Sequence, residues 1–188
     1  MMNNTQEKMV EAKYFLERMI EFQTARIPFK HNLSAFLSAF RSVTFFMQKE
    51  YSGDESFKLW YSTKQKEFDT NEKMDLLNKK RVMTIHHVPL DILSDILVSV
   101  HEKAFASDES FAQLFHADGT IKKEEHIIIN EEPAIIEQVD SQSETIIDNK
   151  CLWYFNDYPN SDVITVCEEG TIYLTAIVLE CITTFSLK

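Results

Sequence analysis

The sequence has few of the residues that break or cross-link a chain: three glycines, four prolines and three cysteines among 188 residues. So few turn formers disfavour a fold made only of short strands and tight turns. Together with 14 phenylalanines, they favour long helices around an aromatic-rich core. The three cysteines, Cys151, Cys167 and Cys181, form no CxxC pair. An odd number of scattered cysteines without a secretion signal indicates reduced thiols, as in the cytoplasm.

The chain also lacks a long apolar run. The longest mostly apolar stretch, YLTAIVLECITTF, is too short to span a membrane and contains Glu180. The segment MMNNTQEKMVEAKYF shows no basic flank followed by an apolar run, so we expect no signal peptide. These features predict a cytoplasmic protein with no membrane partner.

Positive charge is scarce in the second part of the chain. Residues 1–90 carry 14 lysines and arginines against 11 aspartates and glutamates, a net charge of +3, whereas residues 91–188 carry 5 against 19, a net charge of −14. Phosphate attraction dominates nonspecific binding to nucleic acid, so no DNA partner is expected for a chain of net charge −11. The mildly basic first part could still face an anion, and the alternative is a solvated surface that keeps the protein in solution.

Helical spacing of apolar residues predicts four helices in the first part of the chain. They cover about residues 5–24, 28–51, the stretch after the turn SGDES to about residue 68, and 72–87. Pro28 suits the first turn of the second helix, and Asp54 or Ser56 would cap the third. Ser34, Ser38 and Ser42 recur every four residues, which indicates a tight contact with a neighbouring helix, within the bundle or across a dimer.

The later part of the chain has a different pattern. Residues 90–105 fit a helix or a strand equally well. From about 119 to 155, the short β-prone segments HIIIN, AIIEQV, ETIID and CLWYF predict a small antiparallel sheet. A last helix over about 161–186 carries Gly170 within its apolar stripe, which indicates a close helix approach.

The expected fold is therefore α+β and mainly α. It comprises an up-and-down helical bundle (1–90), a small antiparallel β insertion (91–160) and a closing C-terminal helix (161–188) that packs back on the bundle. We expect the three segments to form a single structural domain.

Arg81 stands out because it lies inside the apolar arc of its helix. At about 100° per residue, Met74, Leu77 and Ile85 share one side, and Arg81 falls among them. An arginine there needs a partner. It forms an internal ion pair, extends its head into water, or binds an anionic ligand.

Two histidines, His86 and His87, end the same helix, where the helix dipole favours a cation. They either cap the helix or take part in a site. Lys79 and Lys80 precede Arg81 and could attract phosphates, and Arg41 on the second helix either pairs with a core carboxylate or joins an anion site. The remaining histidines are scattered without zinc-ligand spacing, so neither a metal site nor a cofactor is predicted.

The stretch from Arg81 to His86 reads as arginine, apolar residue, three residues and histidine, which resembles the R-φ-xxx-H motif of the HEPN superfamily. The resemblance extends over about residues 5–90 and does not cover 119–155. It implies a helical bundle that dimerises, and metal-independent cleavage of RNA in toxin–antitoxin and other bacterial defence systems. Active members commonly carry a polar residue just after the arginine, where Val82, Met83 and Thr84 offer only a hydroxyl.

If the resemblance holds, Arg81 would bind the scissile phosphate and His86 would be the general acid or base, leaving a 2′,3′-cyclic phosphate. The two side chains lie about 140° apart on one helix, so two copies in a homodimer would aim them better than one. Lys79, Lys80, His87 and Arg41 would bind the substrate. The alternative is a non-catalytic helical module that binds a protein partner, antitoxin-like, through its acidic half.

Overall fold

The computed structural model describes residues 2–86, 90–104, 107–116, 120–129 and 144–185. Contacts within the chain separate two compact units, residues 1–91 with 158–188, and residues 92–157. We call them the helical unit and the sheet unit. The expected boundaries, 1–90, 91–160 and 161–188, lie close to these, and the expectation of a single structural domain stays a prediction.

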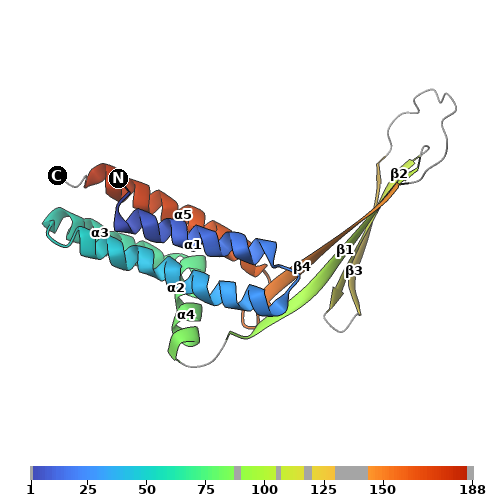
Figure 1. The fold of residues 1–188 in the computed structure, drawn as a ribbon, viewed down its shortest axis with the longest axis horizontal. Helices are drawn as coiled ribbons and strands as arrows, with labels where there is room; N and C mark the ends of the chain where they lie inside the picture. Colours follow the sequence, from blue (N-terminus) through green and yellow to red (C-terminus); the bar gives the residue numbers. More distant parts are fainter. Residues whose placement is uncertain (1, 87–89, 105–106, 117–119, 130–143, 186–188) are drawn as a thin grey trace, which may run out of the picture. The chain divides into compact units, whose positions relative to one another are not determined.

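Five helices make up the described part of the helical unit (Figure 1). They are α1 (Asn4–Glu21), α2 (Arg26–Glu50), α3 (Glu55–Thr70), α4 (Glu72–His86) and α5 (Val163–Thr184). Figure 1 shows α1, α2, α3 and α5 running alongside one another, while α4 turns away from their common direction. The C-terminal helix α5 contacts both α1 and α4, as expected for a closing helix.

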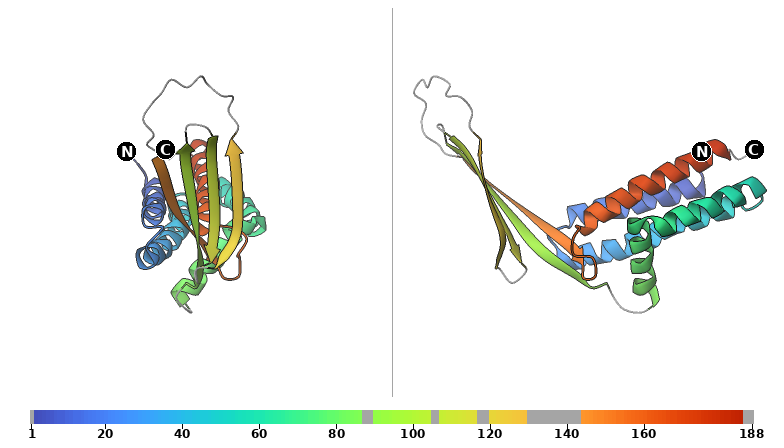
Figure 2. Two further views of the ribbon diagram at one scale, coloured as in Figure 1. Left: turned by 90° about the vertical axis from the view of Figure 1, so that its right-hand side faces the viewer. Right: turned by 180° about the vertical axis from the view of Figure 1, so that it is seen from behind.

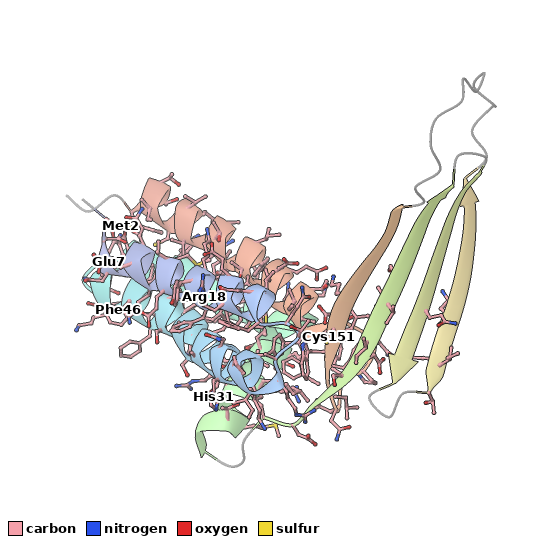
Figure 3. All side chains as sticks on the ribbon, turned by 45° about the vertical axis from the view of Figure 1, so that its right-hand side comes forward. Met2, Glu7, Arg18, His31, Phe46 and Cys151 are labelled. Carbon is pink, nitrogen blue, oxygen red and sulfur yellow. The ribbon has the colours of Figure 1, made fainter. Side chains whose placement is uncertain are left out.

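The core of the helical unit is rich in aromatic residues, as the composition predicts. On α2, a stripe of apolar residues at helical spacing is buried throughout: Phe29, Leu33, Phe36, Leu37 and Phe40. A second cluster joins the ends of α2, α3 and α5, where the Phe57 ring stacks on Tyr51 and Tyr61 with centroid distances of 5.3 and 5.6 Å. Lys8 of α1 lies 5.6 Å from the ring centre of Phe46 on α2, and Figure 3 labels this phenylalanine.

Polar side chains fix where the helices begin. Asn3 and Gln6 form a reciprocal capping box at α1, and Asp54, one of the two expected residues, caps α3. Asn71 ends α3, and its side-chain oxygen accepts hydrogen bonds from the backbone N–H groups of Lys73 and Met74. The expected turn near residue 70 is therefore confirmed. A helix can therefore change direction there without losing its terminal hydrogen bonds.

At Gly170, the helix α5 lies close to both α2 and α4. A Cβ atom at this position would lie 2.5 Å from Cδ1 of Leu77 and 3.5 Å from Cζ of Phe40. The close approach expected from the position of Gly170 in its apolar stripe is confirmed. The missing side chain lets Leu77 fill the space beside the α5 backbone.

The sheet unit is one antiparallel sheet of four strands in the order β3-β2-β1-β4 (Figure 2). The strands are β1 (Ile92–Ala104), β2 (Ser107–His116), β3 (Ile121–Ile129) and β4 (Glu144–Phe155). Lys122 of β3 contacts the buried carboxylate of Asp95 on β1 at 2.5 Å and lies 5.1 Å from the ring centre of Tyr154 on β4. Through these two contacts, Lys122 of β3 connects three of the four strands on one face.

An antiparallel sheet is confirmed, but it is larger than the sequence indicated. The ambiguous stretch 90–105 contains β1, which pairs with β2 and β4 along nearly its whole length. The β-prone segments recognised in the sequence begin near residue 119, whereas β1 and β2 precede them and lie within the expected β insertion of 91–160. ETIID and CLWYF are parts of the single strand β4, while AIIEQV lies outside the described residues. Pairing with partner strands decided these points, and one strand's own periodicity does not contain that information.

Candidate functional site

Arg81 lies on the core-facing side of α4, as its position in the apolar arc predicts. Met74 and Leu77 are 7 % and 1 % exposed, and Arg81 follows them by two turns and one turn of the same helix face. The guanidinium is half-buried, and its Nε is fully buried with no hydrogen-bond partner among the described residues. No carboxylate pairs with Arg81 among the described residues, so the internal ion pair, one of the alternatives that the sequence leaves open, is not observed there.

Arg41 occupies the neighbouring side of α2. Its Nη1 donates to the hydroxyl of Thr44, and that hydroxyl in turn donates to the Arg41 carbonyl oxygen at 3.0 Å. A hydroxyl carries no charge, so this bond does not neutralise the guanidinium. Within the residues that the structure describes, no carboxylate pairs with Arg41, and the expected core ion pair is not observed.

The two arginines line one cavity of about 460 Å³ between α2, α3 and α4. All its lining residues belong to the helical unit: Leu37, Phe40, Arg41 and Thr44 from α2, Tyr61, Ser62, Gln65, Lys66, Phe68 and Asp69 from α3, and Met74, Asp75, Leu77, Asn78 and Arg81 from α4. Volumes of this order are typical of small-molecule sites.

The cavity has an apolar floor and a polar rim. Leu37, Phe40 and Leu77 are 1 %, 6 % and 1 % exposed and form the floor. At the rim, α3 presents an exposed polar stripe with the spacing i, i+3, i+4 and i+7: Ser62, Gln65, Lys66 and Asp69. A ligand that fits this cavity needs an apolar body and a polar end.

Charges of both signs line the cavity. Arg41, Lys66 and Arg81 oppose the carboxylates of Asp69 and Asp75, which leaves one net positive charge. Asp75 also pairs with Lys79 at 2.6 Å, so Lys79, one of the expected substrate-binding residues, is held one turn along α4. The cavity therefore suits an anion, and its two arginines are half-buried whereas Lys66 is exposed.

The other residues singled out in the sequence are placed differently. Lys80 is only 5 % exposed, so it is not the surface lysine that its position in the KKR run suggested. His86 is the last residue of α4, and its side chain, like the whole of His87, lies outside the described residues. The structure thus brings Arg81 and Arg41 together.

Sequence reasoning missed the contribution of α3. Apart from the capping residues, no residue of α3 was predicted to have a role, although Tyr61, Gln65, Lys66 and Phe68 line the cavity. The polar stripe of α3 has helical periodicity and was detectable in principle. Its direction toward Arg81 was not, because that depends on how α3 and α4 pack.

Other site types find no support in the described residues. No group of three or more histidine, cysteine, aspartate or glutamate side chains there could hold a metal ion, and His31 is exposed on α2 (Figure 3). All three cysteines are unpaired, and burial raises the pKa of Cys167 and Cys181, which makes them unreactive at neutral pH. Among the described helices, none is long and apolar enough to cross a membrane.

Comparison with known proteins adds no assignment to this site. No protein-family model matches the chain, and no curated protein or solved structure matches it significantly. The interpretation of the cavity therefore depends on the chemistry of its own residues.

Proposed function

We propose that the helical unit is a HEPN-like up-and-down bundle that binds RNA, with a backbone phosphate held by Arg81 and Arg41. One observation carries the proposal: two arginines without a carboxylate partner among the described residues line the same cavity. A guanidinium has five N–H donors in a planar fork, which matches the oxygens of a phosphate.

The distribution of charge between the units is compatible with this function. The helical unit carries 15 lysines and arginines against 16 aspartates and glutamates, a net charge of −1, whereas the sheet unit carries 4 against 14, a net charge of −10. The acidity of the chain therefore belongs almost entirely to the sheet unit. Local cations in the helical unit do not have to overcome a strong negative charge of their own unit.

The catalytic extension of the proposal is metal-independent cleavage of RNA. Arg81 would stabilise charge on the phosphate oxygens, and His86, five residues later on α4, would move a proton at the ribose 2′-oxygen or at the leaving oxygen. A homodimer would bring the two groups of two copies toward one phosphate. The biological setting would be a bacterial defence or stress system, with an antitoxin-like protein as a possible partner.

The test is RNA cleavage in excess EDTA by the wild type, Arg81→Ala, Arg41→Ala and His86→Ala. We expect wild-type cleavage with 2′,3′-cyclic phosphate ends, its loss in the Arg81 and His86 variants, and weaker RNA binding in the Arg41 variant. Arg18→Ala is the matched control, because Arg18 pairs with Glu21 on α1, away from the cavity. If the folded wild type neither binds nor cleaves a broad panel of RNAs, the proposal is wrong.

A second function is favoured by the charge of −10 on the sheet unit. We infer that this unit would bind a basic protein partner, as a non-catalytic interaction module. Such a complex should weaken steeply as salt is raised from 50 to 500 mM, values on the order of those that screen surface charges. A complex insensitive to salt would contradict this electrostatic account.

A further inference from the structure

The cavity between α2, α3 and α4 has features that a contact with an RNA backbone does not require. A phosphodiester needs cations at a surface, whereas this cavity of about 460 Å³ has a floor of buried Leu37, Phe40 and Leu77. Apolar floors are typical of pockets that enclose the body of a small organic ligand, with a few polar groups that orient it. The floor and the arginines together indicate an amphipathic ligand.

We propose that this cavity binds a small organic monocarboxylate, with its carboxylate on Arg41 and Arg81 and its apolar body on the floor. The site shares Arg41 and Arg81 with the proposed RNA contact but does not depend on it. Bound ligand would occupy the guanidinium groups that the RNA phosphate needs, so the two would compete.

The arginines have the donors that a carboxylate needs. Nε of Arg81 is buried without a hydrogen-bond partner among the described residues, and Arg41 uses only Nη1, on the Thr44 hydroxyl. The remaining N–H groups of the two half-buried guanidinium groups can donate charge-assisted hydrogen bonds to a carboxylate oxygen.

The charge of the lining favours a monoanion over a dianion. Arg41, Lys66 and Arg81 against Asp69 and Asp75 leave a single positive charge, which one carboxylate neutralises. A second negative charge on the ligand would meet the exposed carboxylate of Asp69 at the rim. Replacing Asp69 should therefore change which anions bind.

The experiment is an NMR titration of the full chain that follows the arginine Nε–H signals. The chain has only four arginines, Arg18, Arg26, Arg41 and Arg81, so each signal can be assigned by a single Arg→Lys variant. The probes are 4-phenylbutyrate, its neutral amide, and phenyl phosphate as a dianion. We expect 4-phenylbutyrate to shift the Arg41 and Arg81 signals, with the Arg18 and Arg26 signals unchanged and a much weaker response to the amide.

Variants test the geometry. Arg41→Ala and Arg81→Ala should each raise Kd for 4-phenylbutyrate about tenfold or more, since hydrogen bonds to charged groups are among the stronger ones. Gln65→Trp fills the cavity from its exposed rim without changing the core, and should abolish binding. Asp69→Asn should leave carboxylate binding intact and strengthen phenyl phosphate binding. Arg18→Ala is the matched control and should leave Kd unchanged.

Equal binding of the acid and its amide, or no shift of the Arg41 and Arg81 signals at millimolar probe, would overturn the inference. So would full binding by a folded Gln65→Trp variant. These results would not bear on the proposed RNA cleavage, because cleavage is measured without the probe. Conversely, a protein that binds 4-phenylbutyrate but no RNA would refute the proposed function and support the pocket.

Discussion

The contact of Gly170 with Leu77 allows a quantitative test of the packing that builds the cavity. In Gly170→Ala, the added Cβ would start 2.5 Å from Cδ1 of Leu77, far inside van der Waals contact. Leu77 is 1 % exposed and sits on the cavity floor, so it can yield only by moving toward the cavity or by pushing α4 away from α5. Either movement disturbs the face that holds Arg81.

The expected magnitude combines two opposing effects. Inserting a methyl group into a packed core costs about 1–3 kcal/mol. Alanine in place of glycine in a helix interior returns about 1 kcal/mol, because it restricts the unfolded chain and propagates the helix better. We therefore expect Gly170→Ala to lower the free energy of unfolding by about 1 kcal/mol, a fall in Tm of roughly 2–4 °C for a chain of this size.

The assay is urea unfolding followed by circular dichroism, with Gly53→Ala as the matched control. A Cβ at Gly53 meets nothing within 4 Å, so this change should be neutral or slightly stabilising, by up to about 1 kcal/mol. The double variant with Leu77→Ala should lose less stability than the two single variants lose together. The difference should be about 1 kcal/mol or more, because the clash is gone. A Gly170→Ala protein more stable than the wild type would refute the close approach of α5 to α4.

Three further predictions concern polar and ionisable groups. Glu50 accepts hydrogen bonds from the backbone N–H groups of Asn4 at 2.7 Å and Thr5 at 3.2 Å, so Glu50→Gln should cost about 1–2 kcal/mol in urea unfolding. Glu7→Gln, at an exposed position in the first turn of α1, should cost less than about 0.5 kcal/mol, and equal effects of the two changes would contradict this role of Glu50. Burial raises the pKa of the Cys181 thiol from 9.0 to about 12. The unfolded thiol therefore ionises first, and stability should fall between about pH 9 and 12 more steeply in the wild type than in Cys181→Ala, as unfolding at several pH values would measure; parallel pH curves would exclude the effect. The indole N–H of Trp60 donates to Glu180 at 2.7 Å and holds the pKa of that carboxyl below its usual range. Trp60→Phe should therefore raise the pKa of Glu180 in a carboxyl-detected NMR titration. An unchanged pKa would show that Lys64 alone lowers it.

Much of the helical unit follows from local patterns. The stripe on α2 is buried as its spacing indicates, Asp54 caps α3, and Asn71 separates α3 from α4. These features depend on residues within one or two turns of each other, because capping and amphipathic periodicity are properties of a single segment. The helical periodicity of α4 likewise predicts that Arg81 lies on the same face as Met74 and Leu77.

The sheet was harder to predict because its signals are not local. Ile96 and Val100 satisfy a helical period as well as a strand period, and only pairing with β2 and β4 distinguishes the two. The strand β2 contains two serines, two acidic residues and a glutamine, which hide its period-2 pattern. Its partner β1 supplies the hydrogen bonds that make it a strand.

For the candidate site, the sequence by itself determined which cationic residues were candidates and that Arg81 needed a partner. It did not determine what that partner was. Only the tertiary structure brought Arg41 of α2 and the polar stripe of α3 to the same cavity as Arg81, where the packing of Leu77 against Gly170 is one of the contacts that hold α4. The physical reason is that periodicity fixes the face on which a side chain lies, while the face that meets it is chosen by the packing of the whole unit.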